Sequence, residues 1–202
     1  MKIGIGLPNS VRGATGKVIV EWARRAEARG FSSLGTIGRI AFPAYGELVA
    51  LAAAAGATQR IGLVTDILLG PVYNPVLLAR DAASLDQLSG GRFILGASVG
   101  ARKDDYDITH QDYSARGRRW DEALELMHKI WRGEPPPGTD QPVGPRPTNG
   151  STGSALGVRA PEPGLGAAPG RGGIRGLLCG VSPDTGTTPA AWPLQLRQEF
   201  SP

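Results

Sequence analysis

The chain of 202 residues has little of what marks a secreted, membrane-spanning or metal-binding protein. Its single cysteine, Cys179, cannot form an intramolecular disulfide, which is typical of a reducing compartment. No apolar run approaches the ~20 residues that span a bilayer, and the chain does not begin like a signal peptide. Its two histidines have no ligand spacing of a metal site. We therefore expect a cytoplasmic protein with no membrane segment and no metal.

The charge of the chain does not indicate a nucleic-acid-binding protein. The net charge is +4 and the isoelectric point is near 9.6, but lysine and arginine are spread along the chain. Aromatic residues make up 6% of the sequence and do not interleave with the basic ones. The hydrophobic content of 41% is enough for the core of a domain of this size. We expect a globular domain that binds a small molecule rather than a nucleic acid.

Short apolar segments alternate with amphipathic ones over the first 132 residues. The apolar segments have the composition of buried parallel strands, and they start at residues 2, 33, 61 and 92, spaced by 31, 28 and 31 residues. One helix fits between each pair, and another follows the last strand. This spacing is the period of a repeated βα unit. The predicted strands are 2–7, 33–37, 61–68 and 92–97, and the predicted helices are 17–29, 45–55, 75–88 and 116–132.

Residues 74–100 contain the clearest of these units. Asn74 can cap a helix, and Pro75 suits the first helical position because its missing N–H is not needed there. Gly90 and Gly91 can adopt the positive φ that ends a helix. Glycines at 30, 56 and 133 predict the ends of the other helices in the same way.

The composition changes after residue 133. Thirteen of the 17 prolines and 14 of the 30 glycines lie in residues 133–202, and no periodic apolar pattern continues there. Such a segment cannot bury enough surface to offset chain entropy, so we predict an irregular or disordered tail over residues 136–202. From about residue 150 the Gly, Pro, Ala and Arg content is that of GC-rich DNA translated out of frame, which suggests a frameshift.

Several separate segments resemble the bacterial luciferase-like family of flavin-dependent oxidoreductases and monooxygenases. The resemblance covers about residues 1–150, and the motifs occur in the family's order. It implies an α/β fold of the (β/α)8 TIM-barrel type, of which residues 1–135 contain the first four βα units. It also implies reduced FMN or a deazaflavin coenzyme and a small organic substrate. The segments that carry it are AEARGFSSL (26–34), RIGLVTDILLGPVYNPVLLAR (60–80), SLDQLSGGRFILG (84–96) and RGRRWDEALELMHKIWRGEP (116–135).

Barrel enzymes place their chemistry at the C-terminal ends of the strands, here residues 7–9, 37–39, 65–68 and 97–100. In the family the third strand often ends in a non-proline cis peptide against the flavin, which matches the bond between Thr65 and Asp66. The family's fourth-strand glycines correspond to Gly96 and Gly100, whose missing side chains would let the flavin approach the backbone, and Ser98 lies between them. The resemblance therefore implies that these five residues bind the cofactor.

The chain departs from the family at two positions. Many relatives have an acidic and then a basic residue after the second strand, whereas this chain has Gly38 and Arg39. Arg39 either binds the cofactor phosphate or is solvated, and Asp66 is either beside the flavin or bonded to backbone N–H groups. Ala101 replaces the glutamate of deazaflavin dehydrogenases, which favours a monooxygenase. No catalytic acid or base is evident, and we interpret the His110 segment, residues 102–115, as a solvated loop.

Two functions from different classes stay open. The first is a flavin-dependent monooxygenase or oxidoreductase. The second is a truncated, non-catalytic half-barrel, because an intact barrel has ~250 residues and often builds its phosphate site after strands seven and eight. A half-barrel leaves the first and fourth strands as open edges, which favour pairing with another chain. We therefore expect a homo-oligomer that forms through these edges or through the early helices.

Overall fold

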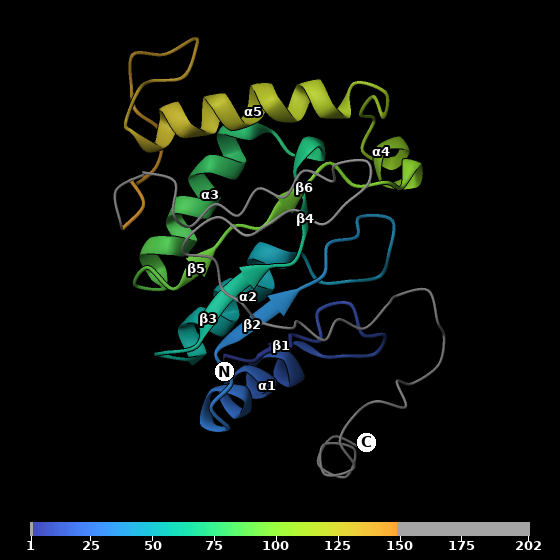
Figure 1. The fold of residues 1–202 in the computed structure, drawn as a ribbon, viewed down its shortest axis with the longest axis vertical. Helices are drawn as coiled ribbons and strands as arrows, with labels where there is room; N and C mark the ends of the chain where they lie inside the picture. Colours follow the sequence, from blue (N-terminus) through green and yellow to red (C-terminus); the bar gives the residue numbers. More distant parts are fainter. Residues whose placement is uncertain (1, 149–202) are drawn as a thin grey trace.

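The computed structural model describes residues 2–148 (Figure 1), and the tail from residue 149, with its proposed frameshift, lies outside the described residues. Its main sheet is parallel with the strand order β1-β2-β3-β5, and a second parallel pair, β4-β6, continues from it. The strands are β1 (Gly4–Gly6), β2 (Ser33–Thr36), β3 (Gly62–Thr65), β4 (Leu68–Leu69), β5 (Phe93–Ile94) and β6 (Ala97–Ser98). The helices are α1 (Gly16–Ala28), α2 (Glu47–Ala57), the 3-10 turn η1 (Gly70–Val72), α3 (Pro75–Leu88), α4 (Lys103–Ile108) and α5 (Arg116–Trp131).

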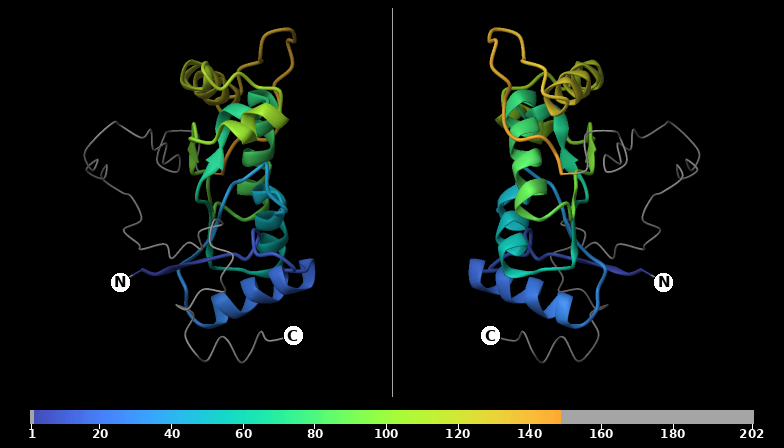
Figure 2. Two further views of the ribbon diagram at one scale, coloured as in Figure 1. Left: turned by 90° about the vertical axis from the view of Figure 1, so that its right-hand side faces the viewer. Right: turned by 90° about the vertical axis from the view of Figure 1, so that its left-hand side faces the viewer.

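One face of the sheet packs against helices. Leu34, Leu63 and Phe93 are aligned across three neighbouring strands and are buried in the hydrophobic core. The next row, with Val64 and Ile94 on the opposite face, is half-buried. Figure 2 shows α1, α2 and α3 together on one side of the strands. The βα order and the parallel sheet that we predicted are therefore confirmed as one wall of a barrel-type fold.

The third and fourth strands are each interrupted, where the sequence predicted single strands over 61–68 and 92–97. β3 ends at Thr65 and β4 resumes at Leu68, while β5 ends at Ile94 and β6 resumes at Ala97. The Thr65 hydroxyl spans the two breaks, because it donates to the Gly96 carbonyl at 2.7 Å and accepts from the Gly96 N–H at 2.8 Å. A side chain thus replaces ladder bonds here, which an apolar pattern does not reveal.

Helix α3 forms as its sequence predicts. The Asn74 side chain accepts hydrogen bonds from the backbone N–H groups of Val76 and Leu77, and Pro75 occupies the first turn. Gly90 and Gly91 have φ values of +65° and +79° beyond its C-terminal end. The helix packs against α5, where the Trp131 indole N–H donates to the Ala79 carbonyl at 2.9 Å.

The N-terminal ends of the strands are held by two charged side chains. The Glu27 carboxylate accepts from the backbone N–H groups of residues 59, 60 and 61, at the turn between α2 and β3. The Arg92 guanidinium donates to the carbonyls of Ala55, Thr58 and Ile61, and so binds the C-terminal end of α2. Cations are favourable there because helix carbonyls carry partial negative charge. The charged side chains at the N-terminal end of the sheet therefore stabilise the fold.

Two local predictions are wrong. Residues 102–115 are not simply a solvated loop, because they contain α4, in which Asp105 and Tyr106 are 2% and 0% exposed. Helix α2 continues past Gly56 and ends at Ala57.

Residues 136–148 form no helix or strand, but they run back over α3, where the Gln87 amide donates to the Arg146 carbonyl at 2.6 Å.

Replacing the α3 cap tests the importance of this helix for stability. We expect Asn74→Ala to lower the free energy of unfolding by about 1 kcal/mol, because two N–H groups of the first turn lose their acceptor. Asn74→Asp keeps an acceptor oxygen and should stay close to wild type. Chemical denaturation followed by circular dichroism measures both, and equal stability of the two variants would contradict the capping role.

Candidate functional site

The C-terminal ends of the strands form an accessible floor. Ile37 and Gly38 after β2, and Asp66 and Ile67 after β3, are half-buried. Residues 98–100, from β6 onward, have the same intermediate exposure. The backbone and apolar side chains dominate this floor, which suits a flat, largely apolar ligand with polar edges.

Asn9 connects the first two strand ends. Its side-chain amide donates to the carbonyls of Ile37 at 3.0 Å and Tyr45 at 3.3 Å, and its oxygen accepts from the Ile37 N–H at 3.2 Å. Asn9 is 1% exposed, so these bonds satisfy a polar group that burial would otherwise destabilise. The sequence placed residues 7–9 at a strand end, but the partners of Asn9 lie 28 and 36 positions away and carry no local signal.

Arg39 lies in an ion-pair cluster with helix α4. Its guanidinium is 3.1 Å from an oxygen of Asp105 and 2.9 Å from an oxygen of Asp104. The other Asp105 oxygen accepts from the backbone N–H groups of Ile40 at 2.9 Å and Ala41 at 2.6 Å. Arg39 is therefore not solvated, and Asp105 fixes the loop after β2. That Arg39 binds a cofactor stays a prediction, although its charge is already compensated by two carboxylates.

Gly96 and Gly100, which we predict to contact the flavin, lie against other residues of the protein. A Cβ on Gly96 would lie 2.2 Å from the Thr65 carbonyl oxygen, and one on Gly100 would lie 2.2 Å from a methyl carbon of Leu69. Gly100 also has a φ of +63°, and its N–H donates to the Ser98 hydroxyl at 3.3 Å. Close packing against Thr65 and Leu69 therefore explains why glycine is found at positions 96 and 100. Cofactor binding by Gly96, Ser98 and Gly100 stays a prediction.

The cis peptide lies one bond later than predicted. It joins Asp66 to Ile67, not Thr65 to Asp66. Thr65 is fully buried and still pairs in register with Thr36, so the strand continues through it. The Asp66 N–H donates to the Thr36 carbonyl at 2.7 Å, which extends the pairing by one further bond. The register of the ladder, which the sequence does not specify, therefore decides where the strand ends.

A buried carboxyl group that we did not predict lies under the floor. Glu47, at the start of α2, is 3% exposed, and its Oε2 atom accepts from the Tyr73 hydroxyl at 3.5 Å. Its Oε1 atom has no hydrogen-bond partner among residues 2–148. Burial raises the pKa of Glu47 above the usual 4.5, and the negative charge of Asp105 adds to this effect. Burial, and after it the neighbouring Glu47 carboxyl group, raises the pKa of Tyr73.

A tyrosine supports the loop after β6. The Tyr106 hydroxyl donates to the Val99 carbonyl, and burial raises the pKa of Tyr106 to about 12. Its ring meets that of Tyr113 edge to face, with centroids 5.3 Å apart, and the Arg116 guanidinium stacks on Tyr113 at 3.9 Å. Helix α4 therefore positions the strand-end loops at 39–41 and 98–101 together.

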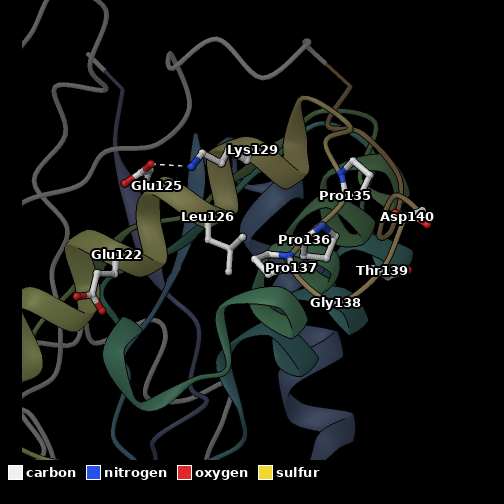
Figure 3. Close-up of a pocket in the computed structure, with 10 residues that line it drawn as sticks. All are labelled: Glu122, Glu125, Leu126, Lys129, Pro135, Pro136, Pro137, Gly138, Thr139 and Asp140. Carbon is white, nitrogen blue, oxygen red and sulfur yellow. Dashed lines mark hydrogen bonds and ion pairs between the residues drawn. The ribbon is translucent and has the colours of Figure 1, made fainter.

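A separate hollow of about 750 Å³ lies between α5 and the segment that follows it, and Figure 3 shows the residues that line it. Leu126 and the prolines 135–137 form its apolar part, and Glu125 and Lys129 form an ion pair at 2.7 Å beside them. These residues belong to α5 and the segment after it, not to the strand ends. The hollow is shallow and mixed in polarity, so we do not assign the chemistry to it.

Metal and membrane signals are missing from the part of the chain that the structure describes. Residues 2–148 contain no group of three or more His, Cys, Asp or Glu side chains placed to hold a metal ion. No helix within this range is long and apolar enough to cross a bilayer. Our expectation that the chain has no metal site stays a prediction.

A parallel sheet with sequential βα units and its accessible residues at the strand C-termini defines the class, an α/β protein of the TIM-barrel type. The model of the luciferase-like monooxygenase family matches residues 1–141, and the chain belongs to this family. It is 36% identical over 86 residues to 4-hydroxyprotoasukamycin monooxygenase of Streptomyces nodosus subsp. asukaensis, which is 43% of this chain and 23% of that protein. It is 38% identical over 84 residues to limonene 1,2-monooxygenase of Rhodococcus erythropolis, 42% of this chain and 22% of that protein.

Solved structures agree with the fold. The structure of monooxygenase RslO1 from Streptomyces bottropensis matches with a TM-score of 0.65 at 25% identity. The match covers 79% of this chain and 53% of the RslO1 chain. The oxygenating constituent of 3,6-diketocamphane monooxygenase from Pseudomonas putida, in complex with FMN, has a TM-score of 0.65 at 21% identity over 79% and 51% of the two chains. The coenzyme F420 dependent tetrahydromethanopterin reductase of Methanopyrus kandleri has a TM-score of 0.61 at 22% identity over 79% and 49%. The chain thus spans about half the length of these structures.

Two neighbouring aspartates of α4 test the support of the loop after β2. We expect Asp105→Asn to lower the free energy of unfolding by about 3 kcal/mol, because it breaks a buried ion pair and leaves Arg39 without its inner partner. Asp104→Asn, at a side chain that is 53% exposed, should cost less than about 1 kcal/mol. Urea titrations of the two variants provide the comparison, and similar losses would show that Asp105 does not fix the loop.

Proposed function

We propose that this chain binds the ring system of a reduced flavin, FMN or a deazaflavin, at the C-terminal ends of β2, β3 and β6, and acts on a small organic substrate as a luciferase-like monooxygenase. The family match over residues 1–141 carries the proposal, because it includes all of these strand ends. One structural neighbour is in complex with FMN and another is coenzyme F420 dependent, and both support a flavin-type cofactor. When bound, the flavin would supply the redox chemistry, and the protein would supply orientation.

The residues of the floor fit a flavin ring better than a flavin phosphate. Ile37 and Ile67 offer half-buried apolar surface, and the Thr36 hydroxyl is buried without a hydrogen-bond partner among the described residues. A phosphate needs cations or free N–H groups, and the Arg39 guanidinium is held by Asp104 and Asp105. We therefore assign the ring, and not the phosphate, to this part of the chain.

Within this proposal, the residues around the strand ends have different roles. Asn9, Thr65 and Asp105 hold the loops in place through their bonds to Ile37, Gly96 and the backbone of residues 40–41. Asp66 is half-buried at the end of β3, where a carboxylate can accept a hydrogen bond from a ring nitrogen of the flavin. The described residues offer no clear proton donor at the floor, so the task of this wall is to bind and to orient.

Flavin titration tests the proposed function. We expect the purified full chain to quench the fluorescence of FMN or of a deazaflavin at micromolar concentrations, and Asp66→Leu to weaken that binding by about tenfold through loss of a charged acceptor. Asp81→Leu is the matched control, since the same change on the exposed surface of α3 should leave the affinity as it is.

Binding of neither cofactor by the folded wild type would instead support the alternative function, a non-catalytic half-barrel. If Asp66→Leu and Asp81→Leu weaken flavin binding equally, Asp66 is not part of the site. The proposed function then depends only on whether the wild type binds a flavin. Circular dichroism of each variant shows whether the fold is retained.

We also propose that two copies of the chain associate through α2. Its outward face consists of Val49, Ala52, Ala53 and Gly56, which are exposed, and Val49 is 71% exposed. This spacing forms one helical stripe without a charge, and small apolar residues allow two such helices to pack closely about a two-fold axis. The edges β1 and β5 of the main sheet offer a second route to association.

A charge placed on this stripe distinguishes the two routes. We expect Val49→Asp to convert an oligomer to a monomer in light scattering, because a carboxylate would be desolvated in the contact. Leu88→Asp is the control, since Leu88 is 75% exposed on α3 and lies outside the stripe. An oligomer that survives Val49→Asp would point to the sheet edges, and a monomeric wild type would contradict both routes.

A further inference from the structure

Glu47 is a buried acid that none of the roles above uses. It occupies the first position of α2 and is 3% exposed, yet only one of its oxygens, Oε2, has a hydrogen-bond partner within residues 2–148. A buried polar atom without a partner is costly, and a buried negative charge without a cation is costlier still. Its position therefore calls for an explanation other than stability.

The geometry around Gly38 supplies one. A Cβ built on Gly38 would lie 2.2 Å from Oε1 of Glu47 and 2.5 Å from the carbonyl oxygen of Ile67. Both oxygens thus crowd the same point, in space that a side chain at position 38 would fill. A carboxylate oxygen and a carbonyl oxygen are both acceptors, so a hydrogen bond between them requires the carboxyl group to be protonated. The missing side chain at Gly38 leaves this space free for both oxygens.

We propose that Glu47 is a positioning residue that stays protonated at neutral pH, and that its Oε1–H group donates a hydrogen bond to the Ile67 carbonyl. The bond would join the start of α2 to the loop after β3, beneath Gly38. It would satisfy both oxygens with a single proton and would leave no buried charge in this place.

Burial and the charge of Asp105 favour the neutral acid at Glu47, whereas its hydrogen bonds act the other way. The hydroxyl of Tyr73, which follows η1, donates to Oε2 and by itself favours the carboxylate. Asp105, on α4, is negatively charged and disfavours a second charge. Burial is the largest influence and acts in the same direction as Asp105, so the pKa of Glu47 is raised even though its own backbone N–H and the Tyr73 hydroxyl favour the carboxylate.

This inference rests on the proposed function in one respect: the backbone that Glu47 holds, at Gly38 and Ile67, is the floor assigned to the flavin ring. Both residues are half-buried and reach the accessible side of the strand ends. A protonated Glu47 would keep the Ile67 carbonyl turned toward the helix layer and away from the cofactor. Glu47 would then act on the ligand only through the backbone.

The proton can be tested without any cofactor. Infrared spectra of the full chain at pH 7 should contain a carboxylic-acid C=O band that Glu47→Gln removes. The free energy of unfolding gives a second measure: because the folded pKa is raised, wild type should lose stability relative to Glu47→Gln as the pH rises above about 4.5, the ordinary value for glutamate. Below that pH the difference should be constant. Absence of the band, together with a pH-independent difference, overturns the proposal.

Cofactor affinity tests the positioning role. Glu47→Gln keeps a donor for the Ile67 carbonyl and an acceptor for Tyr73, so it should rescue the affinity for FMN or deazaflavin to within about twofold of wild type. Glu47→Met has a similar volume but no donor, and it should weaken binding by about fivefold or more, the equivalent of one hydrogen bond. Equal affinities of the two variants would overturn the role in positioning.

The two kinds of readout separate this inference from the proposed function. If the wild type binds neither cofactor, the proposed function fails, and the infrared band and the pH dependence still decide whether Glu47 carries a proton. If the wild type binds a cofactor but Glu47→Gln behaves like Glu47→Met, the proposed function stands and the positioning role fails. Circular dichroism confirms that each variant is folded before it is compared.

Discussion

The pair of hydrogen bonds between the Thr65 hydroxyl and the backbone of Gly96 is the contact on which the strand ends depend. It joins β3 to the segment between β5 and β6 at the place where both strands are interrupted. Thr65 is fully buried, and Gly96 cannot carry a Cβ because the Thr65 carbonyl oxygen occupies that space. One hydroxyl thus connects the two strands directly before Asp66 and Ile67, which belong to the floor.

The two ends of the sheet are built differently. At the N-terminal end, Glu27 and Arg92 bind backbone groups of the α2–β3 turn and hold it closed. At the C-terminal end, Asn9 and Asp105 bind loop backbone in a similar way, but the floor between them stays half-buried and accessible. Buried side chains there form hydrogen bonds with the backbone of the loops and leave the loops accessible. This asymmetry is what a barrel with its chemistry at the C-terminal end requires.

The buried acids show how similar residues acquire different tasks. Asp105 meets a guanidinium and two backbone N–H groups, so its charge is compensated. Glu47 is buried beside a carbonyl oxygen, and burial favours its neutral form although a tyrosine hydroxyl donates to it. Both act on the loops that carry the floor, Asp105 on residues 39–41 and Glu47 on Gly38 and Ile67. Both acids therefore lie next to the loop backbone from which the floor is built.

The sequence by itself determined the order of βα units and the limits of α3, because apolar periodicity, the Asn74 cap and the glycine stops are local signals. The family followed separately from the resemblance of several segments, and the family match confirms it. The sequence also located the strand ends, where the candidate floor lies. The tertiary structure alone decided that β3 and β5 are interrupted, that Arg39 meets α4, and that Glu47 lies beneath Gly38. The reason is physical: each of these features depends on partners that are distant along the chain, and a polar residue in a sequence does not indicate which distant backbone group or charge it will meet.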